Sequence, residues 1–253
     1  MATGKTNARW IRLWAGKYSL SGVTRQIGGF GQRFEETDSS AYQDGVINYT
    51  LGHPEIVMDG YQAVFSNAAS GANFGSFDSL KTLDDADIPV TIGIGIKSTI
   101  IAGDPAMMFV ARRAEYVLNG DGPILVSARF PHATANYYGG KVWGKMLSAF
   151  DAGGYDETTT GASVDMGAAT TTGYSLHLHL YGTVSGNYAL IVEHSTSGAF
   201  GGEEATLATF TTTGAATTSE ISTGTSANRY LRFKATKTAG VVVVDCAAIY
   251  HPA

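Results

Sequence analysis

The chain has 253 residues and a net charge of −5, and charged side chains make up only 15% of it. This length can bury a core as one large domain or two small ones, and the acidic balance argues against tight nucleic-acid binding, because phosphate contacts supply most of that affinity. A single cysteine, Cys246, excludes a disulfide within the chain and a thiolate metal cluster. The N-terminus has no apolar signal core and no apolar run could span a membrane, so we expect a protein made in the cytosol without a membrane partner.

The first third of the chain is predicted to form short strands followed by one helix. Residues 8–31 give a strand, a Gly-Lys turn and a second strand, and residues 45–65 give two more. Phenylalanine and leucine then recur every third residue from Phe74 to Leu83, with Ser76 as a candidate cap. This pattern favours one short helix.

The next elements are predicted to be strands. Residues 88–101 alternate, with Val90 and isoleucines on one face, and with Thr91, Lys97 and two glycines on the other, where the glycines would let a neighbouring element approach closely. Residues 107–130 are typical of a hairpin with an Asn-Gly-Asp-Gly turn.

After a junction at residues 131–144, the rest of the chain is almost purely β in pattern. The predicted strands cover residues 175–184, 187–195, 205–213, 228–236 and 240–250. Their spacing near ten residues indicates a sandwich. We therefore predict an all-β fold with one short flanking helix and two β-sandwich domains in tandem, over residues 1–135 and 141–253.

Two of the six histidines, His177 and His179, lie two residues apart in a predicted strand. On a strand they share one face, while Leu176 and its alternating neighbours form the other, apolar face. We interpret the leucine face as core. The histidine face is expected to be exposed or to meet another subunit, where pH in the imidazole range would tune assembly.

Such a histidine pair can also chelate a metal, and cupin-like sites use one together with a third ligand. The position where a cupin carries its glutamate is Thr183 here. Only Glu193 or His194 could replace it, and adjacent strand residues point to opposite faces. We therefore predict no metal site, with His177 and His179 as the candidates if one exists.

Three other motifs resemble catalytic or nucleotide sites, and each fails on its context. Gly-Lys-Thr at residues 4–6 lacks the preceding strand and upstream glycine of a phosphate loop. Ser195 follows His194 on a strand, so the two side chains point apart. The acidic stretch at residues 83–87 lacks the glycine and final glutamate of a calcium loop. We predict no catalytic residue, no cofactor-binding residue, no cofactor and no enzymatic activity.

Charge is unevenly distributed along the chain. The first 34 residues carry six lysines and arginines and no acid, whereas acids dominate from Glu35 to Ile100. A basic arm facing an acidic body would let identical subunits dock. The alternative is a solvated, locally basic terminus.

The N-terminal run resembles the start of a phage tail tube protein. The matching pieces are Leu-Ser-Gly at residues 20–22, Thr37 with Tyr42, and Met-Asp-Gly-Tyr at residues 58–61. The C-terminal half carries loose motifs similar to the β-rich second half of siphophage tail proteins. They are Val-Asp-Met-Gly at 164–167, residues 192–198, Leu-Ala-Thr-Phe at 207–210 and Arg-Tyr-Leu-Arg at 229–232.

This resemblance implies a structural virion protein of a bacteriophage. Single-domain tube proteins are shorter than this chain. The extra length implies either two tandem tube-like domains or one tube domain with an outer decoration domain. Tube subunits self-assemble into stacked rings that conduct DNA during ejection. Two tandem domains would give a ring of three subunits with pseudo-sixfold symmetry, and a ring of six is the alternative.

The resemblance also implies partners and a location. The other tail proteins would be the tape measure, terminator and distal tail proteins, DNA would only pass through, and the protein would reside in the virion tail after assembly in the host cytoplasm. Acids including Glu35, Glu36 and Asp38 could line the lumen, where basic walls would retain phosphates. The competing interpretations are a virion decoration or carbohydrate-binding sandwich, and a cupin-like metalloprotein.

Overall fold

The computed structural model describes residues 10–21, 24–28, 30–38, 49–65, 87–96, 99–112, 115–120, 124–131, 142–149, 155, 157–181, 186–212 and 218–251. Every named element in these ranges is a β-strand, which confirms the all-β prediction. The helix predicted between Phe74 and Leu83 lies outside the described residues. No helix among the described residues is long and apolar enough to cross a membrane.

The strands of the first half are β1 (Ile11–Ala15), β2 (Tyr18–Ser19), β3 (Thr24–Gln26), β4 (Phe30–Asp38), β5 (Tyr49–Val64), β6 (Ile88–Ile94), β7 (Pro105–Ala111), β8 (Glu115–Asn119) and β9 (Leu125–Pro131). Those of the second half are β10 (Trp143–Met146), β11 (Thr159–Thr160), β12 (Val164–Asp165), β13 (Tyr174–Leu180), β14 (Tyr188–Ser195), β15 (Ala205–Thr212), β16 (Thr218–Gly224), β17 (Tyr230–Lys237) and β18 (Val244–Tyr250).

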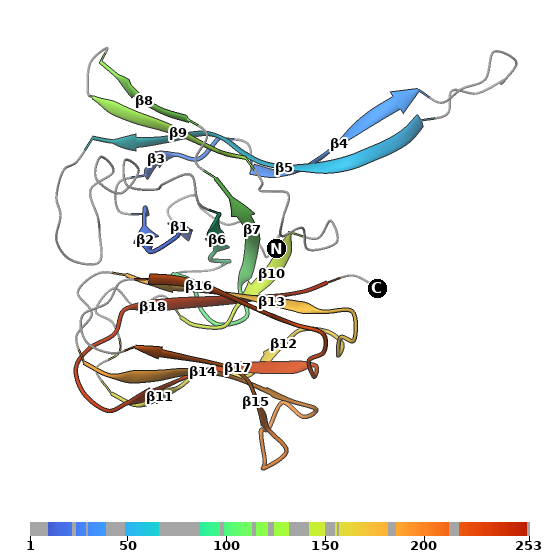
Figure 1. Ribbon diagram of the computed structural model, residues 1–253, viewed down its shortest axis with the longest axis vertical. Helices are drawn as coiled ribbons and strands as arrows, with labels where there is room; N and C mark the ends of the chain where they lie inside the picture. The colour runs from blue at the N-terminus through green and yellow to red at the C-terminus, as the bar shows by residue number, and fades with distance from the viewer. Residues whose placement is uncertain are drawn as a thin grey trace, which may run out of the picture.

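These strands form three antiparallel sheets that stack in layers (Figure 1). The largest has eight strands in the order β16-β13-β18-β10-β7-β6-β1-β2. A five-stranded sheet, β3-β5-β9-β8 with β4 beside β5, covers one side of it, and a second, β11-β17-β14-β15 with β12 beside β17, covers the other. The large sheet draws strands from both predicted domains and is continuous through β10. The division near residues 135–141 stays a prediction.

The eight-stranded sheet folds back on itself. The β13 and β6 strands are separated in the sheet by β18, β10 and β7, yet side chains of β13 bond to Thr91 of β6. Figure 1 shows the consequence: β1, β2, β6 and β7 form one layer, and β13, β16 and β18 form the next. We call the first layer with its five-stranded partner the N-terminal sandwich, and the second with its partner the C-terminal sandwich.

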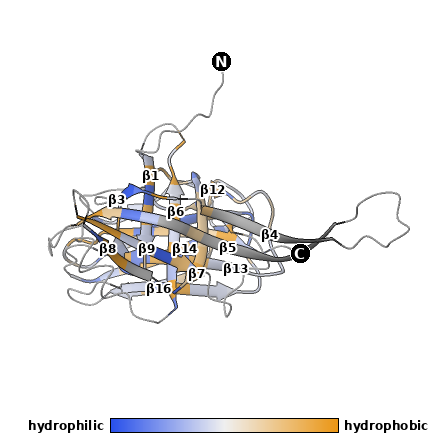
Figure 2. Ribbon diagram, turned by 90° about the horizontal axis from the view of Figure 1, so that it is seen from above, coloured by the Kyte–Doolittle hydropathy of each residue, from blue (hydrophilic) through white to orange (hydrophobic). Residues whose placement is uncertain are grey.

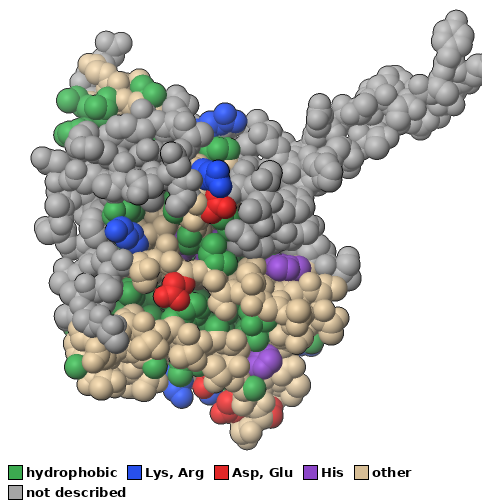
Figure 3. All heavy atoms as spheres, viewed as in Figure 1, with side chains coloured by type: hydrophobic (Ala, Val, Ile, Leu, Met, Phe, Trp, Pro, Cys, Tyr) green, Lys and Arg blue, Asp and Glu red, His purple; other side chains and the backbone are tan. Residues whose placement is uncertain are grey.

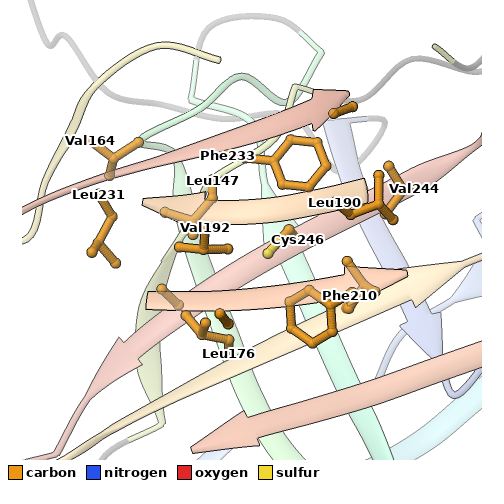
Figure 4. Close-up of a cluster of buried hydrophobic side chains, with 14 of the residues drawn as sticks. Leu147, Val164, Leu176, Leu190, Val192, Phe210, Leu231, Phe233, Val244 and Cys246 are labelled. Carbon is orange, nitrogen blue, oxygen red and sulfur yellow. The ribbon is translucent and has the colours of Figure 1, made fainter. Parts of the chain in front are cut away.

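Three apolar clusters fill the spaces between the layers. One lies in the N-terminal sandwich and includes Phe109 and Phe130, and another lies in the C-terminal sandwich around Cys246 (Figure 4). The third lies inside the fold of the large sheet, where Trp14 joins side chains from β7, β10 and β18. Each fully buried large side chain contributes about 1.5–3 kcal/mol by leaving water, so the inner cluster stabilises the contact between the two sandwiches.

Strand patterns explain how the large sheet serves two cores at once. In β6, Val90 and Ile92 face the N-terminal sandwich core while Thr91 and Gly93 face the inner cluster. The predicted close approach at the glycine face is present: a Cβ on Gly93 would lie 2.7 Å from the Ile100 side chain and 3.0 Å from the Trp14 ring. The β7 and β18 strands are buried on both faces apart from Pro105 at the start of β7, as expected for nearly continuous apolar runs.

The β4–β5 hairpin projects from the body (Figures 1 and 2). The β4 strand pairs with β5 as far as Tyr49, whereas β9 pairs with β5 only from Val57 onward. Among the described strands, the stretch of β5 from residue 49 to 56 therefore has a neighbour on one side only. At about 3.4 Å per residue this stretch is about 27 Å long.

The predicted hairpin at residues 107–130 is confirmed in its second part. The β8 and β9 strands pair antiparallel from Glu115↔Arg129 to Asn119↔Leu125, so they enclose the predicted turn. The β7 strand, which the same prediction placed in this hairpin, pairs instead with β6 and β10 in the eight-stranded sheet.

Candidate functional site

The histidine pair lies inside the protein. His177 is 0% exposed and His179 is 1% exposed, because the face of β13 that carries them is covered by β6 and by the turn after β1. The expectation of an exposed or subunit-facing histidine face is therefore wrong. The expected alternation is confirmed, since Leu176, Leu178 and Leu180 all belong to the C-terminal sandwich core.

Short hydrogen bonds hold both rings. His179 Nδ1 lies 2.7 Å from the Gly16 carbonyl oxygen and must donate, because a carbonyl only accepts. In the neutral ring Nε2 then accepts, and it lies 2.8 Å from the Thr91 hydroxyl, which donates its proton. The same Thr91 oxygen lies 3.1 Å from His177 Nδ1. One hydroxyl thus lies within hydrogen-bonding distance of both imidazoles.

Burial strongly favours the neutral rings. It lowers the pKa of His179 from 6.5 to about 4, although the hydrogen bond to Gly16 acts in the opposite direction. For His177 burial is again the main cause of a lowered pKa, the neighbouring His179 adds to it, and a backbone hydrogen bond to Val90 opposes it. Trp14 stacks on the His179 ring, with centroids 6.2 Å apart.

The third ligand that a cupin-like centre needs is not supplied by either predicted residue. Glu193 and His194 lie on β14, in the sheet that covers the opposite, leucine face of β13. Glu193 instead forms an ion pair of 2.6 Å with Arg232 and lies 3.7 Å from Lys234. Within the part of the chain that the structure describes, no three histidine, cysteine, aspartate or glutamate side chains gather as metal ligands.

A buried carboxylate lies beside the histidines. Asp245 is paired across the sheet with His179 and is 1% exposed. Its carboxylate accepts hydrogen bonds from the Tyr181 hydroxyl at 2.5 Å and from Ser148 at 3.2 Å. Sequence reasoning missed this polar cluster, because its members lie far apart in the chain. Asp245 inside an apolar strand was the one available signal.

The other candidate surfaces concern assembly. Hydrophobic side chains are exposed at the tip formed by β8, β9 and the end of β5, where Figure 3 shows a hydrophobic group at the upper left. This apolar tip consists of Val64, Val117, Leu118 and Ile124, with exposed fractions of 39–49%. The β8 strand is also the edge of its sheet. An edge strand with exposed apolar side chains is a site where another chain can add.

The predicted charge clusters are placed only in part. Glu35, Glu36 and Asp38 belong to the projecting β4 strand, but their side chains lie outside the described residues, as does the basic stretch before Trp10. Asp87 pairs with Arg112 at 2.5 Å. The lumen assignment of the acids and the docking role of the basic arm stay predictions.

No protein-family model matches the chain, and no curated protein matches it. Among solved structures, it is similar to the Dit (gp 19.1) protein of phage SPP1, described as a paradigm of the hub adsorption apparatus of phages infecting Gram-positive bacteria, with 13% identity and a TM-score of 0.30 over 94% of this chain and 99% of that chain. A chain of the phage p2 baseplate in its activated conformation with Sr gives 8% identity and a TM-score of 0.32 over 94% and 97%. At such TM-scores neither likeness establishes a shared fold or function.

Proposed function

We propose that the protein is a structural subunit of a phage tail that joins copies of itself through the edges of the β3-β5-β9-β8 sheet. The observation that carries this proposal is the projecting β4–β5 hairpin. A two-stranded hairpin is only marginally stable alone in water. The overhang of β4 and β5 is about 27 Å long, from the rise per residue of a strand. A neighbouring chain that pairs with this overhang would explain its stability. The N-terminal resemblance to tail tube proteins supports the same assignment.

The same sheet offers a complementary partner for the hairpin. Among the described strands, the outer edge of β4 and the free edge of β8 lie on opposite sides of the sheet, so copies arranged head to tail would pair both edges. Such a heterologous contact closes into a ring when its rotation permits. The apolar tip would be buried at that contact.

In the finer form of the proposal, rings stack into a siphovirus tail tube that conducts DNA during ejection. Two tandem domains favour three subunits with pseudo-sixfold symmetry over six subunits. The tape measure, terminator and distal tail proteins would be the partners, and the subunit would act without catalysis or a cofactor.

Electron microscopy and light scattering of the purified protein test this proposal. We expect rings or hollow tubes, and the mass per ring distinguishes three subunits from six. Leu118→Lys at the β8 edge should abolish them, whereas the matched control Ile101→Lys, at an exposed apolar residue outside this sheet, should not. Assembly of the Leu118→Lys variant at the wild-type yield would contradict the proposed contact.

An exposed tryptophan favours a second candidate, a carbohydrate-binding sandwich of the virion surface. Trp143 is 43% exposed beside a groove of about 270 Å³ that Pro105, Met166 and Tyr250 help to line. An exposed indole offers an apolar face and a polar N–H, which suits a sugar ring. Glycan binding that is lost in Trp143→Ala, by a protein that stays a small oligomer, would favour this function over the tube.

A further inference from the structure

The two sandwiches meet through a small set of buried side chains that we call the joint. The N-terminal sandwich contributes Trp14, the Gly16 carbonyl and Thr91, and the C-terminal sandwich contributes His177 and His179. The inner apolar cluster surrounds them. The only main-chain pairing between the two layers in the described sheet runs through β10 with β7. The joint therefore carries much of the specific contact between the layers.

We propose that the joint is an acid-sensitive latch: protonation of His177 and His179 opens the contact between the two sandwiches while each sandwich keeps its own core. The geometry explains why the closed joint disfavours protonation of the two rings. Nε2 of His179 is an acceptor from the Thr91 hydroxyl, so a proton there reverses the direction of that bond and leaves the hydroxyl proton without this acceptor. The two rings lie 6.1 Å apart, and two buried positive charges at this separation repel each other.

The groups that raise the pKa of the two rings are backbone carbonyls of Val90 and Gly16, and not carboxylates. On β18, Asp245 is paired across from His179, and its carboxylate accepts hydrogen bonds from Tyr181 and Ser148. From β6, β7 and β16 the described residues that face the rings are uncharged, since Glu220 of β16 pairs with Leu178 and is exposed.

Two further charged groups lie at the margin of the joint. Arg12 shares the Trp14 face of β1, is half-buried and bonds the Ile11 carbonyl. Asp104 precedes β7 and accepts from the Ile101 amide. Beyond the pair along β13, Ser175 bonds His251, which is half-buried at the end of the row. Asp104 is thus held by a backbone amide at the margin of the joint.

The direction of the pH effect follows from the lowered pKa values. Between pH 6.5 and about 4 the opened joint binds protons that the closed joint refuses. Closure is therefore fully favoured above 6.5 and weakens as the pH falls. For His179 alone, the change from 6.5 to about 4 corresponds to roughly a 300-fold loss in the closing equilibrium at the acid end.

Two side chains report separately on the joint and on a sandwich core. Trp14 lies in the joint, and replacing Trp10 and Trp143 by phenylalanine leaves it as the single indole of the chain. Cys246 is the only cysteine, and it lies in the C-terminal sandwich core, on the face of β18 away from the joint. The emission of Trp14 and the reactivity of Cys246 with a pyridyl disulfide can be followed together from pH 7.5 to 4.5.

As the pH falls from 7.5 to 4.5, we expect the Trp14 emission to shift reversibly to the red while Cys246 stays unreactive. His177→Asn with His179→Asn keeps an amide donor near each Nδ1 and removes the titration, so the shift should vanish, whereas the control His194→Asn should keep it. Simultaneous exposure of Trp14 and Cys246, or no shift at all in the Trp10→Phe, Trp143→Phe protein, would overturn the proposal. The Trp10→Phe, Trp143→Phe protein keeps both histidines. Its Trp14 emission and Cys246 reactivity therefore test the proposal even if the double asparagine variant does not fold.

Discussion

Replacing Thr91 by valine tests the bridging hydroxyl at the centre of the joint. Valine has nearly the shape of threonine, so the change opens no cavity, but it removes the hydroxyl that donates to His179 Nε2 and lies 3.1 Å from His177 Nδ1. Both rings are fully buried and gain no water in exchange. Leaving a buried polar group unsatisfied costs about 1–3 kcal/mol, so the two nitrogens together predict a loss of about 2–6 kcal/mol in the free energy of unfolding.

Equilibrium urea unfolding at pH 7.5, followed by circular dichroism and by tryptophan emission, measures this loss. Thr209→Val is the matched control, because Thr209 is exposed on β15 and such surface changes stay within about 0.5 kcal/mol. Thr91→Ser should recover most of the loss by restoring the hydroxyl. A Thr91→Val variant as stable as the Thr209→Val control would refute the hydrogen-bond assignment.

The remaining predictions concern a close backbone contact and a surface ion pair. Gly144→Ala should destabilise the protein by several kcal/mol, roughly the cost of overpacking or more, because its Cβ would lie 2.1 Å from the Ala248 carbonyl oxygen; thermal unfolding measures it, and Gly120→Ala, with nothing within 4 Å, is the control. Asp165 bonds Arg229, which is the main reason that its pKa falls from 3.8 to about 2. The resulting stability is present above pH 3.8 and is lost as the pH falls through about 2. An NMR titration should return the midpoint toward 3.8 in Arg229→Gln, and an unchanged midpoint would argue against the pair.

Local patterns predicted many of the strands, because alternation depends only on near neighbours, although residues 45–65, predicted as two short strands, contain the single long strand β5. The leucine face of β13 and the two faces of β6 follow directly from the order of apolar and polar residues. The same patterns could not show what covers the second face of β13. In an ordinary two-layer sandwich that face meets solvent, and here it meets β6 because the large sheet folds back.

The candidate site was therefore found in part. His177 and His179 were singled out by their spacing, but Thr91 and Gly16 carry no local signal and lie 86 to 163 residues away from their partners. The apolar tip had a faint signal in Ile124 and Leu118, which flank a polar turn although hydrophobic. The sequence pattern does not distinguish exposed hydrophobic residues of this kind from core residues, because their burial depends on whether another layer covers them.

The position of β18 has a consequence for the order in which the protein folds. This strand lies between β13 and β10 in the large sheet, although every other described strand precedes it in the chain. Until Val244–Tyr250 leaves the ribosome, β13 and β10 have no common neighbour, and the large sheet cannot be continuous between the two layers. Nascent chains would then expose unpaired edges late in synthesis, when non-local strand pairing is slow and aggregation competes. Completion of β18 thus sets the earliest moment at which a subunit is ready to meet another.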